Sequence, residues 1–113
     1  MINLSENKII KLKNAIRNFL QTKLGESPSQ IYCYLNNNFI AIYIHDINSL
    51  AEQKMMRLQE NQKLLIDYKT QEFEIVKPDL IKRIERILDL KLNKIYSLVT
   101  EDGIRIINLR IHN

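Results

Sequence analysis

The stretch IYCYLNNNFIAIYIH, residues 31–45, decides most about the fold of this chain. Two segments rich in isoleucine, tyrosine and phenylalanine flank three consecutive asparagines. β-Branched and aromatic residues favour strands, and asparagine tolerates the positive φ angles of a tight turn. A two-residue turn at Asn37 and Asn38 therefore predicts a β-hairpin in which Cys33 lies opposite Ile42.

This register sorts the hairpin into two faces, because successive strand residues point to opposite sides. One face is aliphatic apart from a cysteine, and it consists of Ile31, Cys33, Leu35, Ile40, Ile42 and Ile44. The other face holds Tyr32, Tyr34, Ala41 and Tyr43. The aliphatic face is expected to meet the helical layer, which leaves the tyrosine face on the far side of the sheet.

A helix is predicted before the hairpin, from Lys8 to Leu24. Its apolar residues recur at intervals of three and four, as in an amphipathic helix, and they are Ile9, Leu12, Ile16, Phe19, Leu20 and Leu24. Ser5 is the expected N-cap. Gly25 is the expected left-handed residue at the C-terminal end, and Pro28 prevents continuation.

Two further helices are predicted in the middle of the chain. The segment Ser49-Leu50-Ala51-Glu52 has the capping-box spacing, so a helix begins there and continues past Tyr68. Pro78 is expected to interrupt or kink it, because proline lacks a backbone N–H and disfavours helix at the preceding residue. The next helix has the apolar stripe Leu80, Ile81, Ile84, Ile87 and Leu88.

A second hairpin is predicted from residues 92–100 and 104–112, which surround the strong turn signal Asp102-Gly103. A two-residue turn there places Val99 opposite Ile106. One face then carries Tyr96, Leu98, Ile107, Leu109 and Ile111, and the other carries Ile95, Val99, Ile104 and Ile106. Both faces are apolar, which a sheet with one solvated side does not show.

The predicted fold class is therefore α+β in the order α-β-β-α-α-β-β, with a four-stranded, largely antiparallel sheet packed against helices. The length of 113 residues fits a single domain, 1–113. A single cysteine fits a reducing compartment, and residues 1–6 have no signal-peptide pattern. No window approaches 18 uncharged apolar residues, so we expect a soluble, cytoplasmic protein without a membrane span.

Four stretches of the chain resemble a known family in order and spacing. They are Leu24-Gly25 followed by Pro28, Tyr34 to Ile44, Ser49 to Lys54, and Lys77-Pro78-Asp79-Leu80-Ile81 through Glu85. They are similar to segments of the MpsC-like family of small bacterial proteins, named for a Na+-translocating membrane-potential-generating system. The resemblance implies a soluble accessory or regulatory domain. Asp89 departs from the family pattern, which usually has a glycine there, and residues 68–74 lack the usual arginines.

Catalytic, metal and cofactor sites are not expected, and we expect no enzyme. A cysteine nucleophile needs a base within hydrogen-bond reach, but the predicted register puts Cys33 and His45 on opposite faces, with His45 paired to Gln30. His45 and Asp46 could serve a small hydrolase or transferase only inside a concave pocket. Two histidines and one cysteine supply no zinc-ligand spacing, and the chain has neither a dinucleotide-binding nor a phosphate-binding glycine motif.

Two kinds of binding surface remain as hypotheses. The leading one is a protein interface formed by Tyr32, Tyr34, Tyr43, Ile95, Val99, Ile104 and Ile106, either covered by a second copy in a homodimer or by the chain's own middle helix. The alternative is a nucleic-acid-binding module on the basic face of the first helix, through Lys11, Lys13 and Arg17. The formal net charge of +4 is dispersed and does not decide between them.

Overall fold

The structure, a computed structural model, describes residues 6–112. Its elements are α1 (Glu6–Leu24), β1 (Gln30–Leu35), β2 (Phe39–His45), α2 (Leu50–Met55), α3 (Gln59–Leu88), β3 (Leu92–Val99) and β4 (Arg105–Ile111). The strands form one antiparallel sheet in the order β1-β2-β4-β3. The predicted α+β class and element order are confirmed.

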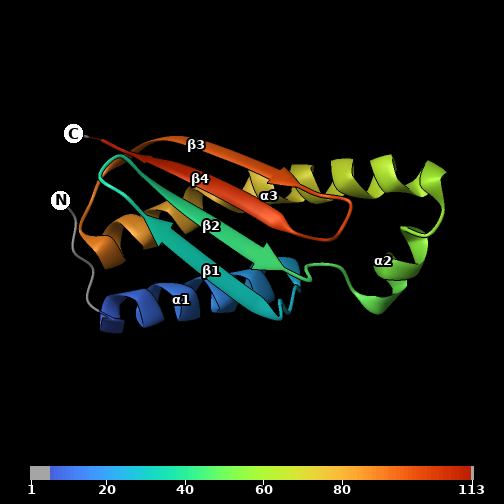
Figure 1. Cartoon of the computed structure of the whole chain (residues 1–113), viewed down its shortest axis with the longest axis horizontal. Coiled ribbons are helices and arrows are strands. Elements are labelled where there is room, and N and C mark those ends of the chain that lie inside the picture. The colour runs from blue at the N-terminus through green and yellow to red at the C-terminus, as the bar shows by residue number, and fades with distance from the viewer. Residues whose placement is uncertain (1–5, 113) are drawn as a thin grey trace.

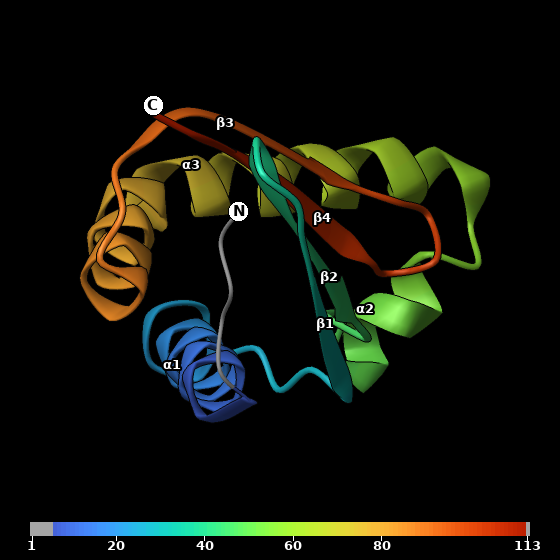
Figure 2. The same cartoon turned by 60° about the vertical axis from the view of Figure 1, so that its left-hand side comes forward.

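The molecule has two layers, with α1 and α3 side by side behind one face of the sheet (Figure 1). The core lies between the layers and is almost entirely aliphatic. From the sheet it takes Ile31, Ile40, Ile42, Ile44, Ile107, Leu109 and Ile111, and from the helices Leu12, Ile16, Phe19, Leu20, Phe73, Leu80, Ile84 and Leu88. No helix lies on the opposite face of the sheet in the described part of the chain (Figure 2).

The first hairpin has the predicted register. Cys33 lies opposite Ile42 and Ile31 opposite Ile44, and the N–H of Asn36 donates to the carbonyl of Phe39 across the two-residue turn. The side chain of Asn36 also accepts from the N–H groups of Asn38 and Phe39. The turn therefore satisfies its own backbone donors, which is the reason for the asparagine preference at such positions.

The second hairpin is shifted by one residue from the predicted register. Val99 lies opposite Arg105, because the loop has three residues and not two. The N–H of Thr100 donates to the carbonyl of Ile104, and Gly103 takes a positive φ of 76°. A type I turn followed by a left-handed glycine adds one residue to the loop. The shift exchanges the faces of the β3 residues from Lys94 to Val99 relative to β4, and a second irregularity between Leu92 and Lys94 leaves Leu92 on the face of Ile111.

The break between the two middle helices also differs from the prediction. The capping box at Ser49 and Glu52 is present, but the helix it starts ends at Met55. The chain then turns at residues 56–58, and α3 continues for 30 residues without an interruption at Pro78. Pro78 is exposed, so the helix carbonyl that lacks a donor faces water, and buried residues on both sides of it hold the helix together.

The predicted helix caps have mixed outcomes. Gly25 has a positive φ of 65°, and the N–H of Glu26 bonds the carbonyl of Leu20 in the expected C-terminal motif. Ser5, the expected N-cap of α1, lies outside the described residues. Asp89 ends α3 in the left-handed conformation, φ 54°, which glycine adopts without the steric cost of a side chain.

Candidate interaction surface

The open face is the side of the sheet that the helices leave uncovered. It is formed by alternate strand residues: Gln30, Tyr32, Tyr34, Phe39, Ala41, Tyr43, His45, Lys94, Tyr96, Leu98, Ile106, Asn108 and Arg110. Its largest side chains are strongly exposed, with 58% of Tyr34 and 65% of Tyr96 accessible to solvent. Aromatic and aliphatic side chains thus form a continuous surface across all four strands.

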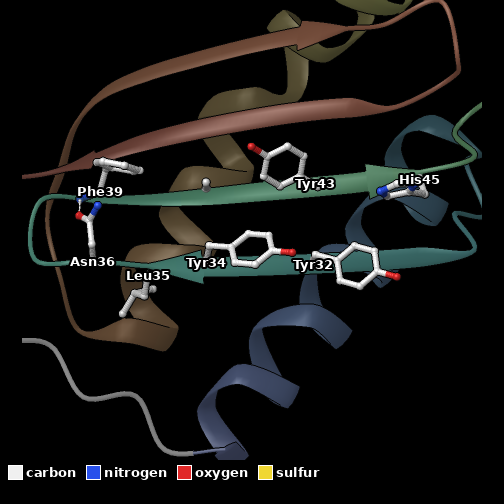
Figure 3. A pocket seen from close by; sticks show the side chains of 8 residues that line it. Tyr32, Tyr34, Leu35, Asn36, Phe39, Tyr43 and His45 are labelled. Atoms are coloured by element: carbon white, nitrogen blue, oxygen red, sulfur yellow. Dashed lines mark hydrogen bonds between the residues drawn. The ribbon is translucent and has the colours of Figure 1, made fainter.

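The β1–β2 part of the open face has a shallow hollow of about 580 Å³ (Figure 3). Ala41 lines this hollow together with larger aromatic residues. Tyr34 and Tyr43 pack edge to face with ring centroids 5.6 Å apart, and Tyr32 packs in the same way on His45 at 5.3 Å. Edge-to-face contacts of this kind favour defined orientations of the rings.

The charges of the open face are positive. None of the four described strands contains an aspartate or glutamate. Lys94 and Arg110 lie directly opposite each other on β3 and β4, and both are exposed. Like charges in this position destabilise a sheet, so an acidic group that bound there would relieve a local repulsion.

The predicted interface residues divide between the two faces. Tyr32, Tyr34, Tyr43 and Ile106 lie on the open face, as expected. Ile95 and Val99 do not, because the one-residue shift of the second hairpin turns them toward the helices, where they pack against the core. Tyr96 and Leu98 take their place on the open face, together with Phe39 from β2. Ile104 is half-buried and immediately precedes β4.

A buried cluster of charged side chains lies at the other side of the sheet. Arg105 is fully buried and donates to Glu26 at 2.5 Å and to the carbonyl of Lys69 at 3.3 Å. The guanidinium also lies over the ring of Phe73, 4.7 Å from its centroid. The ammonium of Lys69 contacts Glu26 at 3.2 Å, Glu52 at 3.0 Å and the carbonyl of Ile47 at 3.3 Å.

This cluster connects four elements rather than offering a reactive group. Two cations meet two carboxylates, and the three protons of the Lys69 ammonium have three acceptors. Partial burial alone would raise the pKa of the Glu52 carboxyl, but hydrogen bonds from the backbone of Ser49 and from Lys69 hold it below its ordinary value of 4.5. The charged side chains of this cluster therefore link β4 to α2, to α3 and to the loop after α1 through ion pairs and hydrogen bonds.

A polar hollow of about 460 Å³ lies beside this cluster. Glu52, Lys69, Glu72 and Asp46 are among its lining residues. Asp46 already accepts a hydrogen bond from the hydroxyl of Ser29. Within residues 6–112, no group of three histidine, cysteine, aspartate or glutamate side chains is arranged to hold a metal ion.

Comparison with known proteins identifies the family. The model of the family described as "Na+-translocating membrane potential-generating system (MpsC)" matches residues 6–110. The chain belongs to the MpsC family. No curated protein and no solved structure matches the chain. None of the helices in the described part of this MpsC-family chain is long and apolar enough to cross a membrane.

The residues considered for catalysis are kept apart in the MpsC fold. Cys33 points to the covered face and His45 to the open face, in agreement with the predicted pairing of His45 with Gln30. Burial raises the pKa of the Cys33 thiol to about 11, although the charge of Lys13 acts in the opposite direction. His45 and Asp46 line different hollows, so they do not face one common pocket.

The three cations proposed for nucleic-acid binding do not share one side of α1. Lys13 and Arg17, four residues apart, lie on one flank of the buried stripe. Lys11 lies on the other flank, about 160° around the helix from Lys13 at 100° per residue. Arg17 also donates from Nη1 to the carbonyl of Pro28 at 2.5 Å, so part of its donor capacity is used within the fold.

Sequence reasoning missed the charged residues of the buried cluster. One signal was present in α3, where Lys69 stands four residues from both Leu65 and Phe73 and thus interrupts a buried apolar stripe. Arg105 alternates with Ile107, Leu109 and Ile111, so the strand pattern alone places it on their face whatever the register of the hairpin. Glu26 gave no signal, since its partners are 43 and 79 residues away in the chain.

Proposed function

We propose that this MpsC-family chain is a non-enzymatic accessory or regulatory domain that acts by protein–protein contact, with the open face as its contact surface. One observation supports this most strongly: a four-stranded sheet has aromatic side chains on the face that carries no helix. Tyrosine and phenylalanine are enriched in protein interfaces, and apolar patches of this extent mark interaction sites. Tyrosine suits such a surface because its polar tip tolerates water when no partner is bound.

The proposal of a non-enzymatic role rests on the separation of the reactive side chains. Cys33 has its pKa raised by burial and faces the core, and His45 packs against a tyrosine ring. Lys69 has its hydrogen bonds satisfied by acceptors within the fold. Covalent catalysis requires a nucleophile and a base that meet in one pocket. These residues do not form such a pair. The proposal includes a cytoplasmic location, supported by the single, unpaired cysteine.

The experiment compares partner capture by two purified variants of the chain. The open-face variant Tyr34→Ser/Tyr96→Ser removes two exposed rings, and the control variant Lys11→Ser/Arg17→Ser changes two exposed residues of α1. Each is used with wild type for crosslinking and affinity capture from lysate of the native cell, with mass spectrometry as the readout. We expect a protein that wild type and the α1 variant retain and that the open-face variant loses.

A partner captured equally by all three proteins would overturn the assignment of the open face. Loss of the partner only with the α1 variant would place the contact on the helical side of the molecule. Circular dichroism and urea unfolding of each variant establish that the comparison is made between folded proteins.

A further inference from the structure

A second apolar surface lies on the N-terminal half of α3. Leu64, Tyr68 and Ile75 are 67%, 57% and 80% exposed. With Gln71 they are spaced four, three and four residues apart, so they form one stripe along the helix, here called the α3 stripe. Spacing of this kind is typical of a helix that packs against another surface.

The borders of the α3 stripe are acidic. Glu60, Asp67 and Glu74 recur every seven residues, which keeps them on one side of the stripe, and all three are exposed. Glu72 borders the other side, and its charge together with a hydrogen bond raises the pKa of the Tyr68 hydroxyl. Two of these carboxylates have lysine partners on the same helix, Asp67 with Lys63 and Glu74 with Lys77, and ion pairs of this kind contribute little at the surface.

The open face and the α3 stripe are complementary in charge and in shape. The open face is aromatic and has Lys94 and Arg110 but no carboxylate, whereas the stripe is apolar with carboxylates along both borders. From Glu60 to Glu74 the stripe is about 21 Å long at 1.5 Å per residue. From Phe39 to His45 the strand β2 is about 20 Å long at 3.3 Å per residue.

We infer that the α3 stripe of a second copy of this chain docks on the open face. This inference rests on the proposed function, because it names the partner of the same surface. The docked helix gives the sheet a helical layer on its second face and brings the acidic border of the stripe to Lys94 and Arg110, whose mutual repulsion it relieves. Two stripes cannot pair with each other as favourably, since both have acidic borders.

This contact is heterologous, because a helix of one copy meets the sheet of the next. After the first contact one copy still has a free stripe and the other a free open face, so assembly continues into a ring or an open chain. The prediction is a mass that rises with concentration beyond that of a dimer. An isologous sheet-to-sheet homodimer would stop at two copies.

The test uses one variant for each half of the contact. The sheet variant Lys94→Glu/Arg110→Glu makes the open face acidic and leaves the stripe intact. The helix variant Leu64→Ser/Ile75→Ser removes two strongly exposed apolar side chains from the stripe and leaves the open face intact. All four positions are exposed, so both variants are expected to fold, which circular dichroism and urea midpoints check.

Light scattering after size-exclusion chromatography is measured over a dilution series for wild type, each variant and their equimolar mixture. We expect wild type to associate beyond two copies, each variant alone to associate at least tenfold more weakly, and the mixture to form a 1:1 complex and nothing larger. The mixture associates because the intact stripe of the sheet variant fits the intact open face of the helix variant.

Three results would overturn the inference. A wild-type protein that stays monomeric at every concentration leaves the open face to a foreign protein, so the proposed function survives and the inference does not. A dimer that the sheet variant loses and the mixture does not restore indicates an isologous sheet contact. Association that neither variant weakens places the contact elsewhere.

Discussion

The two faces of the one sheet differ in their side chains although they share the same backbone. The covered face has isoleucine and leucine around a closed cluster of charges, whereas the open face has tyrosine, phenylalanine and unneutralised cations. Aliphatic side chains interdigitate tightly against helices, and buried charges are tolerated when they are paired with opposite charges. Aromatic rings with polar tips tolerate water. The covered face therefore stabilises the fold, and the open face is the surface that we propose for protein contact.

The most damaging single change is expected in the buried cluster of the covered face. Glu26→Ala leaves Lys69 with one carboxylate and Arg105 with none, and breaking a buried ion pair in this way costs about 3–5 kcal/mol. Urea unfolding followed by circular dichroism measures the loss. The control Asp67→Ala breaks an exposed pair and should leave the midpoint almost unchanged. Equal losses in both variants would mean that the cluster contributes no more than a surface pair.

Substitution of one leucine on each face compares how much the two faces contribute to the free energy of unfolding. Leu109 is 1% exposed on β4, and Leu98 is 52% exposed on β3. Leu109→Ala is expected to lower the free energy of unfolding by about 2–5 kcal/mol, because it opens a cavity in the core. Leu98→Ala should cost about 1 kcal/mol or less in dilute solution. A larger loss for Leu98→Ala would show that the open face is packed within the monomer.

The alkylation rate of a cysteine is expected to differ between the two faces of the sheet. Cys33 has a thiol pKa of about 11, so little thiolate is present near pH 8. Its alkylation by iodoacetamide should be roughly a hundredfold slower than that of a cysteine placed on the open face by Tyr34→Cys in a Cys33→Ser background. In concentrated urea the two rates should converge. Similar rates in the folded protein would contradict the burial of Cys33.

The smallest expected effect is a pH dependence at the edge of the buried cluster. Glu52 has a pKa below its ordinary value of 4.5 in the folded chain, so its stabilising contribution is complete above that pH. The contribution is lost as the pH falls from 4.5 through the lower folded-state pKa. The difference in unfolding free energy between wild type and Glu52→Gln should therefore shrink over this range. A difference that stays constant would mean that the Lys69 contact does not favour the charged carboxylate.

The two hairpins show how far turn chemistry predicts register. At Asn37 and Asn38 the two-residue turn was predicted and is present, and every pairing of β1 with β2 followed from it. At Asp102-Gly103 the same rule failed, because glycine also suits the last position of a three-residue loop. A left-handed glycine is required by both turns, so the sequence signal does not separate them.

The middle helices show where tertiary packing overrides a local signal. Proline in a helix interior costs about 3 kcal/mol, which favoured a break at Pro78. Buried Phe73 and Leu80 lie on either side of it and pack into one core, and this burial outweighs the cost of one missing hydrogen bond. The break occurs instead at residues 56–58, where no residue is buried.

The sequence by itself determined the helices and strands, their order, the first turn and the apolar residues of each element, because these depend on neighbours within a few positions of the chain. Only the tertiary structure decided the register of the second hairpin, the continuity of α3 and the meeting of Glu26, Lys69 and Arg105. These features depend on contacts between residues far apart in the chain. Each is therefore determined by the free energy of the whole folded domain and not by the local sequence. The open face is the joint result, since the sequence supplied its tyrosines and the fold left them without a helix.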